Sequence, residues 1–251
     1  MNLTVLGSGT VIPHPERGNS GYFLRTPGHG ILMDGGAGAL RKMADFGLDY
    51  RLVDTVAYTH FHPDHTLDLV PLLFSLKHDP SVERPRSLRI LGPPGFQSFF
   101  DRVMDVYGEW VRSEDITVGI DEVFRDRIDL EDIQITTAHT EHTPESVVYR
   151  FQERGGGSLF YSGDTGVNDE LIGTARNVDV LVLECSLPDG QKSPGHLTPS
   201  ECGRIAEQTA CGRLVLTHFY PQVLHTDILA SVSRSYTGQV DLAFDGMEVE
   251  I

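Results

Sequence analysis

The chain has 251 residues, 39% of them hydrophobic, and its 36 acidic and 20 basic residues give a formal net charge of −16. This length can bury a sizeable core, but no apolar run approaches the roughly 20 residues that a membrane-spanning helix needs. The charge disfavours a broad nucleic-acid surface, because Lys and Arg contacts to phosphates supply most non-specific affinity. The densest basic stretch, residues 84–89, is expected to be a solvated loop.

The cysteines and the N-terminus favour a cytoplasmic location. Cys185, Cys202 and Cys211 form no CxxC pair and are odd in number, which fits a reducing compartment better than a disulfide framework. We expect all three to be buried. Residues 1–6 carry neither a basic flank nor a long apolar stretch, so no secretory signal is expected.

Hydrophobic periodicity and turn residues predict strands with helices interspersed. In chain order these are strands at 3–6, 22–25 and 31–33, a helix at 39–46, a strand at 55–59, helices at 66–78 and 97–107, strands at 133–138, 147–151, 158–161 and 180–183, a helix from 199 to about 210, a strand at 214–216, a helix at 227–235 and short closing strands. Thr198-Pro199-Ser200-Glu201 has the capping-box pattern with proline at the first helical position. With no repeat and no linker, we expect a single domain over residues 1–251, with two sheets packed face to face and helices outside.

Three histidines and an aspartate occur within six residues, directly after the strand predicted at 55–59. Imidazole and carboxylate groups suit zinc, manganese or iron. His60 and His62 are two residues apart and can point to one side. Pro63 then turns the chain, so that Asp64 and His65 can face a second point. The segment can thus serve two metal ions; the alternative is a histidine-rich loop without ligands.

One further motif, Met33-Asp34-Gly35, precedes this segment. Three follow it, in the order His139-Thr140-Glu141-His142-Thr143-Pro144, Tyr161-Ser162-Gly163-Asp164 and Leu216-Thr217-His218. With this set the chain resembles the metallo-β-lactamase superfamily, which implies a four-layer αββα sandwich. The resemblance implies one metal ion held by His60, His62 and His142, a second held by Asp64, His65 and His218, and Asp164 bridging the two. It also implies that Asp34 orders the histidine loop without binding metal. His139 competes with His142 for its place, and the following Thr143-Pro144 favours His142.

Four more segments are most similar to the ribonuclease Z group of phosphodiesterases: Leu6-Gly7-Ser8-Gly9-Thr10, Leu183-Glu184-Cys185-Ser186, Gly195-His196-Leu197-Thr198 and Thr217-His218-Phe219-Tyr220-Pro221. The resemblance implies that Glu184 and His196 form a catalytic pair; the alternative is a structural pair beside a helix cap. Members that process tRNA commonly insert a long arm where this chain has only residues 151–160. Its absence makes tRNA cleavage doubtful.

The predicted function is therefore hydrolysis of a small or flexible phosphodiester, such as a cyclic nucleotide or an RNA end, with two divalent ions, zinc first and Mn²⁺ or Fe²⁺ as alternatives. Asp64 would take the proton of the attacking water, and His196 would protonate the leaving alkoxide or bind the phosphoryl oxygen. The alternatives are an ester, thioester or lactone hydrolase, a tRNA 3′-processing endoribonuclease, and a redox or scaffolding metal module. By analogy with relatives, we expect a homodimer.

Overall fold

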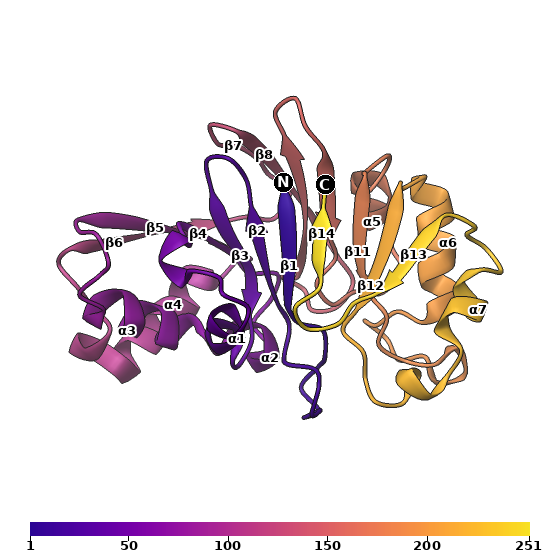
Figure 1. Ribbon diagram of the computed structural model, residues 1–251, viewed down its shortest axis with the longest axis horizontal. Helices are drawn as coiled ribbons and strands as arrows, with labels where there is room; N and C mark the ends of the chain where they lie inside the picture. The colour runs from indigo at the N-terminus through magenta and orange to yellow at the C-terminus, as the bar shows by residue number, and fades with distance from the viewer.

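Two seven-stranded sheets form the centre of the computed structural model, which describes all residues, Met1–Ile251 (Figure 1). The strand order in the first sheet is β14 (Glu248–Glu250), β1 (Asn2–Gly7), β2 (Gly21–Arg25), β3 (Gly30–Gly35), β4 (Thr55–Ala57), β5 (Arg86–Gly92) and β6 (Ile116–Glu122). The strand order in the second sheet is β13 (Gln239–Leu242), β12 (Arg213–Thr217), β11 (Val180–Glu184), β10 (Ser158–Tyr161), β9 (Val147–Glu153), β8 (Ile133–His139) and β7 (Arg127–Asp129). The two termini lie side by side (Figure 1), because β14 pairs with β1 in antiparallel register.

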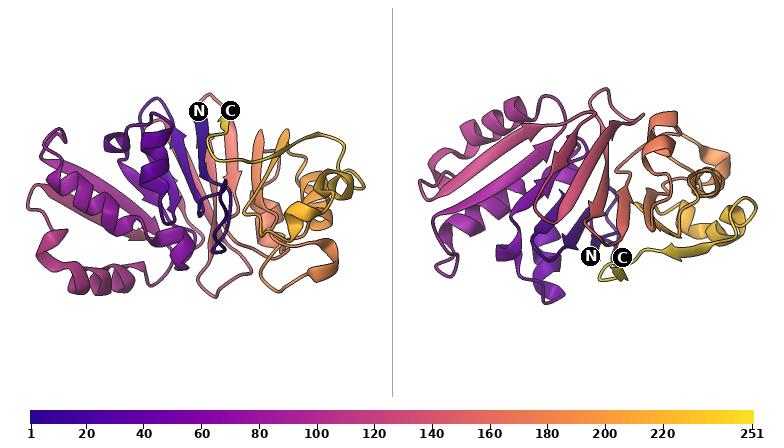
Figure 2. Two further views of the ribbon diagram at one scale, coloured as in Figure 1. Left: turned by 60° about the horizontal axis from the view of Figure 1, so that its bottom comes forward. Right: turned by 90° about the horizontal axis from the view of Figure 1, so that it is seen from above.

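Helices cover the outer face of each sheet, so the chain forms four layers (Figure 2). The α-helices are α1 (Ala39–Asp45), α2 (Pro63–Thr66), α3 (Leu69–His78), α4 (Phe96–Tyr107), α5 (Asp169–Thr174), α6 (Pro199–Thr209) and α7 (Ile228–Val232). Short 3₁₀ segments are η1 (Tyr50–Leu52), η2 (Gly108–Trp110), η3 (Asp189–Gln191) and η4 (Val223–His225). Helices α1, α3 and α4 pack on the first sheet, and α5, α6 and α7 pack on the second. The predicted αββα sandwich is confirmed.

The core between the sheets consists of 22 buried residues drawn from both of them. Tyr22 of the first sheet and Tyr161 of the second have ring centroids 4.8 Å apart at this interface. Fully burying one large apolar side chain contributes about 1.5–3 kcal/mol, so this layer holds the two sheets together. The predicted burial of the three cysteines is also confirmed, and all three are free thiols.

Two predicted elements are interrupted or shortened where a buried carboxylate accepts hydrogen bonds from backbone amides. The helix expected at 66–78 is broken at Asp68, whose carboxylate accepts hydrogen bonds from Gly38 N (3.0 Å) and Leu40 N (2.8 Å) at the start of α1. The strand expected at 55–59 stops at Ala57, and the Thr59 amide donates to the Asp34 carboxylate at 2.9 Å. The helix expected at 227–235 is shorter, and the capping box of α6 is present as predicted.

Strands β5, β6 and β7 and helix α5 were not predicted. The basic stretch expected to be a solvated loop lies partly in β5, so that prediction was wrong. The Arg86 guanidinium donates to the carbonyl oxygens of Arg51 (3.0 Å) and Val53 (2.6 Å) and thereby fastens β5 to the segment before β4. In β6 the apolar residues Ile116, Val118 and Ile120 alternate, but only Ile116 is buried. None of the helices has the length and apolarity required to cross a membrane.

The fold brings the ends of several strands to one edge of the sandwich. Strands β3 and β4 run parallel, as do β10, β11 and β12. The carboxyl ends of parallel strands meet at the same edge, where α/β proteins commonly bind ligands. This edge is the lower one in Figure 1, beside α2. The predicted site residues lie at or just after these strand ends.

Candidate metal centre

The seven predicted ligand residues form two adjoining groups of nitrogen and oxygen atoms. The first group contains His60, His62, His142 and Asp164, and the second contains Asp64, His65 and His218. Each residue offers one potential ligand atom, and within a group these atoms all lie within 4.8 Å of one another. Asp164 faces both groups: its Oδ1 lies 3.3 Å from the Nε2 atoms of His65 and His218, and its Oδ2 lies 3.7 Å from His142 Nε2. The structure therefore brings all seven of these side chains together.

Four of the converging atoms are buried and have no hydrogen-bond partner: His60 Nε2, His65 Nε2, His218 Nε2 and Asp164 Oδ1. A buried polar atom without a partner costs about 1–3 kcal/mol, so such atoms rarely cluster without a ligand. Imidazole nitrogens and carboxylate oxygens around one point are the donors that divalent transition metals prefer. The residues present therefore fit a divalent metal ion.

Asp34 holds the histidine loop from beneath. It is fully buried, and its backbone has a left-handed φ of 50°. Its carboxylate accepts four hydrogen bonds, from His65 Nδ1 (2.8 Å), Tyr161 Oη (2.7 Å), Thr59 N (2.9 Å) and Thr59 Oγ1 (2.9 Å). Backbone strain of this kind persists where the surroundings impose it. Asp34 thus orders the loop, as the resemblance implied.

Glu184 occupies an equivalent place beneath the other end of the cluster. The side chain is 1% exposed and lies at the end of β11. Its Oε1 accepts from Thr165 N (2.8 Å) and His196 Nδ1 (2.9 Å), and its Oε2 accepts from Leu197 N (3.1 Å) and Ser186 Oγ. All four acceptor positions of a carboxylate are therefore used.

His196 is half-buried and belongs with Asp164 and His218 to a third group of neighbouring ligand-type atoms. Burial lowers the pKa of His196, but the hydrogen bond from its Nδ1 to Glu184 outweighs burial and raises that pKa to about 9. Tyr220 stands edge-on to both His196 and His218, with ring centroids 6.0 Å away. His196 is placed to exchange a proton at the cluster through Nε2.

Comparison with known proteins identifies the family. A Beta-lactamase superfamily domain matches residues 15–219. The chain belongs to the metallo-β-lactamase superfamily. The uncharacterized protein Rv1339 of Mycobacterium tuberculosis is 32% identical over 96% of this chain and 88% of its own length. Ribonuclease Z of Thermobifida fusca is 28% identical over 99% of this chain and 94% of its own length. The crystal structure of the metallo-β-lactamase fold protein YhfI from Bacillus subtilis is similar with a TM-score of 0.85 and 25% identity over 99% of this chain and 98% of that one.

The relatives confirm both the superfamily and the ribonuclease Z resemblance. With the histidine and aspartate cluster, they make this chain a metal-dependent hydrolase. The alignment with Ribonuclease Z of Thermobifida fusca runs over 305 positions against the 251 residues of this chain. That relative therefore contains segments that this metallo-β-lactamase chain lacks.

Burial and the neighbouring charges shift the pKa values of several side chains in the cluster in opposite directions. Burial lowers the pKa of His60 well below its usual value. Burial also opposes the charge on His65, but the carboxylates of Asp164 and Asp34 outweigh burial and raise the pKa of His65 well above its usual value. For Asp164 the neighbouring histidines, His218 first, outweigh burial and hold its pKa well below the usual range. A protonated His65 beside an ionised Asp164 thus takes up part of the charge that a metal ion would neutralise.

The structure separates the two histidines that competed for one ligand place. His142 lies in the cluster, where its Nδ1 hydrogen-bonds to Gly195 O at 2.9 Å and its Nε2 lies 3.1 Å from His62 Nδ1. His139 ends β8 and packs against the Phe124 ring, with centroids 5.2 Å apart. Three residues of loop after β8 are what carries His142 into the site.

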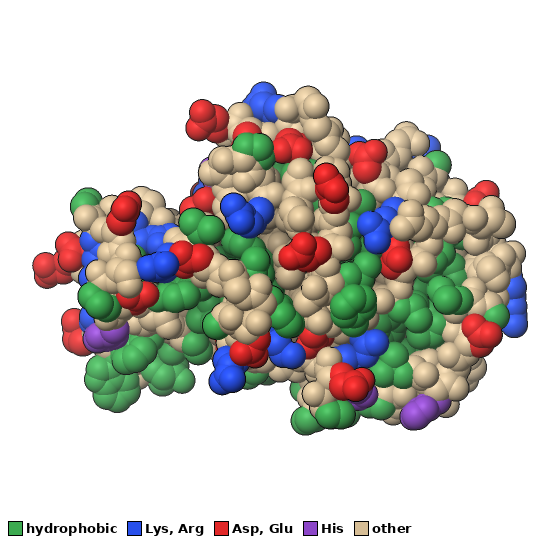
Figure 3. Space-filling model, viewed as in Figure 1, with side chains coloured by type: hydrophobic (Ala, Val, Ile, Leu, Met, Phe, Trp, Pro, Cys, Tyr) green, Lys and Arg blue, Asp and Glu red, His purple; other side chains and the backbone are tan.

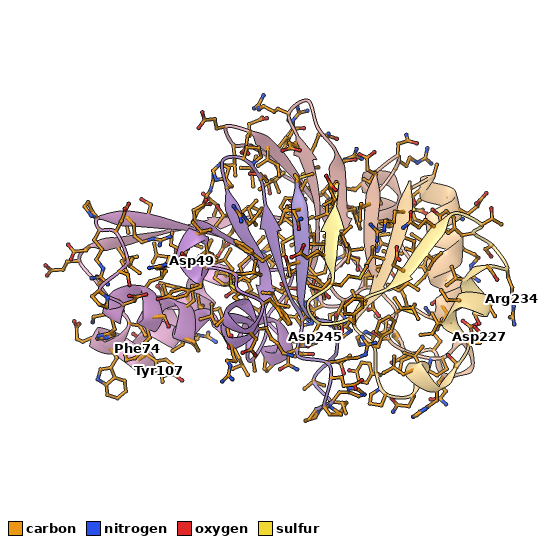
Figure 4. All side chains as sticks on the ribbon, in the orientation of Figure 1. Asp49, Phe74, Tyr107, Asp227, Arg234 and Asp245 are labelled. Carbon is orange, nitrogen blue, oxygen red and sulfur yellow. The ribbon has the colours of Figure 1, made fainter.

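The glycine-rich segment after β1 is fastened from within the chain. Asp245, labelled in Figure 4, lies beside this segment. It accepts hydrogen bonds from Ser8 N and Ser8 Oγ (both 2.9 Å) and from Gly18 N (2.7 Å), and Thr10 Oγ1 accepts from Ile12 N. The hydroxyls of Ser8 and Thr10 therefore both take part in ordering this segment.

Sequence reasoning did not single out Thr59 and Ser186. Each places a hydroxyl between a buried carboxylate and a histidine of the cluster. Position could have indicated them: Thr59 directly precedes the first histidine, and Ser186 stands two residues after Glu184.

Proposed function

We propose that this hydrolase is a phosphodiesterase that uses two divalent ions, zinc in the first place, on a small or flexible phosphodiester such as a cyclic nucleotide or a short RNA end. The observation that carries the proposal is the His196–Glu184 pair, joined at 2.9 Å, beside Asp164 and His218. Cleaving a phosphodiester requires a proton for a leaving alkoxide, and a carboxylate-bound imidazole can provide it. Relatives named Ribonuclease Z also support this reaction class.

The two donor groups divide naturally into two ion sites. One ion would be held by His60, His62 and His142, and the other by Asp64, His65 and His218, with Asp164 between them. Nitrogen and carboxylate donors without thiolate are common in catalytic zinc sites. When bound there, such ions supply hydroxide at neutral pH and offset negative charge on the phosphate.

The remaining roles belong to side chains of the chain itself. Asp64 Oδ2 lies 3.7 Å from His218 Nε2, inside the cluster, and would take up the proton released by the attacking water. His196 would deliver a proton from Nε2 to the leaving oxygen, or bind a phosphoryl oxygen. Glu184 fixes the tautomer of His196 by accepting from Nδ1. His62, His142 and His196 are more exposed than the other histidines of the cluster, so a substrate would approach from their side.

A pre-tRNA endoribonuclease is the second candidate, favoured by the name Ribonuclease Z of several relatives. Two features weigh against it. Strands β9 and β10 are joined by the short turn at residues 154–157, where an arm would be inserted. Lys and Arg side chains are also scattered among Asp and Glu on the face shown in Figure 3, and the net charge is −16. A small substrate fits these features better than a polyanion.

The test combines metal analysis with a substrate panel on the purified full chain. Metal content is measured by elemental analysis, and rates are measured on an aryl phosphodiester, cyclic nucleotides, pre-tRNA, a lactone and a thioester. We expect two ions per chain and turnover of the phosphodiesters. Turnover of the lactone or thioester alone would overturn the proposal, and tight, salt-sensitive binding and cleavage of pre-tRNA would favour the second candidate.

The homodimer, the single domain and the cytoplasmic location stay predictions.

A further inference from the structure

Two buried carboxylates each support two histidines of the cluster, one directly and one through a hydroxyl group. Asp34 accepts directly from His65 Nδ1 at 2.8 Å, and Glu184 accepts directly from His196 Nδ1 at 2.9 Å. Each carboxylate accepts four hydrogen bonds in all, and Asp34 and Glu184 are at most 1% exposed. The two supports come from different sheets, from β3 and β11.

The hydroxyl groups of Thr59 and Ser186 carry each support to a second histidine. Thr59 Oγ1 lies 2.9 Å from Asp34 Oδ2 and 3.0 Å from His60 Nδ1. Ser186 Oγ contacts Glu184 Oε2 and lies 3.0 Å from His218 Nδ1.

The single proton of a hydroxyl group decides the direction of these bonds. An ionised carboxylate has no proton to donate, and a hydrogen bond to it is stronger than one to a neutral acceptor. The hydroxyl proton therefore goes to the carboxylate, in preference to His218 O, which lies 3.2 Å from Ser186 Oγ. The oxygen lone pair is left to accept a proton from Nδ1 of the histidine.

We infer that Thr59 and Ser186 are positioning residues, each of which holds its histidine as the Nδ1–H tautomer with a bare Nε2 directed into the cluster. The inference rests on the metal site of the proposed function. His60 Nε2 and His218 Nε2 are indeed buried without a hydrogen-bond partner. A histidine in the opposite tautomer would direct an N–H at the ion and could not bind it. Outer partners that orient ligand histidines typically change metal affinity by about 10–100-fold when removed.

The test compares variants that lose the hydroxyl of Thr59 or Ser186 with control variants that lose a hydroxyl outside the metal cluster. Thr59→Val removes the hydroxyl at almost constant volume, and Thr59→Ser keeps it. Ser186→Ala removes the second hydroxyl. The control for Ser186→Ala is Ser158→Ala, because the buried Ser158 Oγ also donates to a carboxylate, that of Asp179, at 2.7 Å but touches no histidine.

Thr55→Val is the corresponding control for Thr59→Val. Thr55 is buried at the other end of β4, and its Oγ1 donates to Asp54 Oδ1 at 2.7 Å. Neither Thr55 nor Ser158 belongs to the metal cluster.

Two readouts are independent of catalysis. Zinc affinity is measured by competition with a chelator, and the tautomers of His60 and His218 are read from imidazole ¹⁵N shifts of the metal-free protein. We expect Thr59→Val and Ser186→Ala to bind zinc about 10–100-fold more weakly and to lose the pure Nδ1–H signature. We expect Thr59→Ser and both controls to match the wild type.

Unchanged affinity and tautomers in both hydroxyl-free variants would overturn the inference, as would equal losses in the controls. Should one variant fail to fold, the other position and Thr59→Ser still decide the question. A wild type that binds zinc but hydrolyses no phosphodiester would remove the proposed function while leaving this inference standing. If the wild type hydrolyses phosphodiesters while Thr59→Val and Ser186→Ala both bind zinc normally, the proposed function would stand and this inference would fail.

Discussion

Removing the metal should destabilise the fold by an amount that the structure allows us to work out. The four buried atoms without partners are His60 Nε2, His65 Nε2, His218 Nε2 and Asp164 Oδ1. Leaving such an atom unpaired costs about 1–3 kcal/mol. The low end applies here, because Asp164 Oδ1 lies only 3.3 Å from His65 Nε2 and relieves part of the penalty. The metal-free protein should therefore lose roughly 4 kcal/mol of unfolding free energy.

This loss is large enough to be seen by calorimetry. For a chain of this size, each kcal/mol shifts the melting temperature by about 2–4 °C, so the metal-free protein should melt roughly 8–16 °C below the zinc-loaded protein. Chelator-treated protein is compared with the same sample after zinc is restored, with the metal content measured in both. Calcium serves as the control ion, because it prefers six to eight oxygen ligands and should not restore the melting temperature.

A metal-free sample that melts within about 2 °C of the loaded one would contradict this expectation, because even a single unpaired group should shift the melting temperature by more than that. Restoration by calcium would also contradict it, since a nonspecific charge effect would then explain the result.

Four further outcomes follow from the same geometry. Asp164→Ala removes the side chain that faces both donor groups, so elemental analysis should find neither ion retained; two retained ions would exclude a bridging position. His142→Ala should weaken zinc binding far more than His139→Ala, because only His142 lies in the cluster, and the reverse ranking would exchange their roles. His196→Ala should keep its metal but slow turnover by about 10²–10⁴-fold, whereas near-normal rates would make His196 structural. Burial lowers the pKa of His65, but its carboxylate neighbours, Asp164 first, raise that pKa well above the usual value. A metal ion must then displace the proton of His65, so zinc affinity should rise with pH, and calorimetry in two buffers should detect proton release. Zinc binding that does not depend on pH would contradict this prediction.

Local signals in the sequence were sufficient to predict most strands and the concentration of ligand-type side chains at residues 60–65, whereas the more distant members of the cluster were implied by the family resemblance. The His60 to His65 segment concentrates four donor side chains in one turn of chain, and a spacing of two after a strand places His60 and His62 together whatever the rest of the fold does. The capping pattern at Thr198 likewise marks a helix start by purely local hydrogen bonding. Such features depend on neighbours in the chain, so they can be predicted without knowledge of distant contacts.

Only the tertiary structure decided which residues, distant in the sequence, form hydrogen bonds with these local segments. Asp68 breaks a predicted helix because it caps α1, and Thr59 leaves its strand because Asp34 takes its amide; neither partner can be inferred from periodicity. The relay from Glu184 through Ser186 to His218 joins residues up to 34 positions apart at the ends of neighbouring strands β11 and β12. Hydrogen bonds of this kind depend on strand order and register, which arise from packing of the whole sandwich and not from the composition of any one segment.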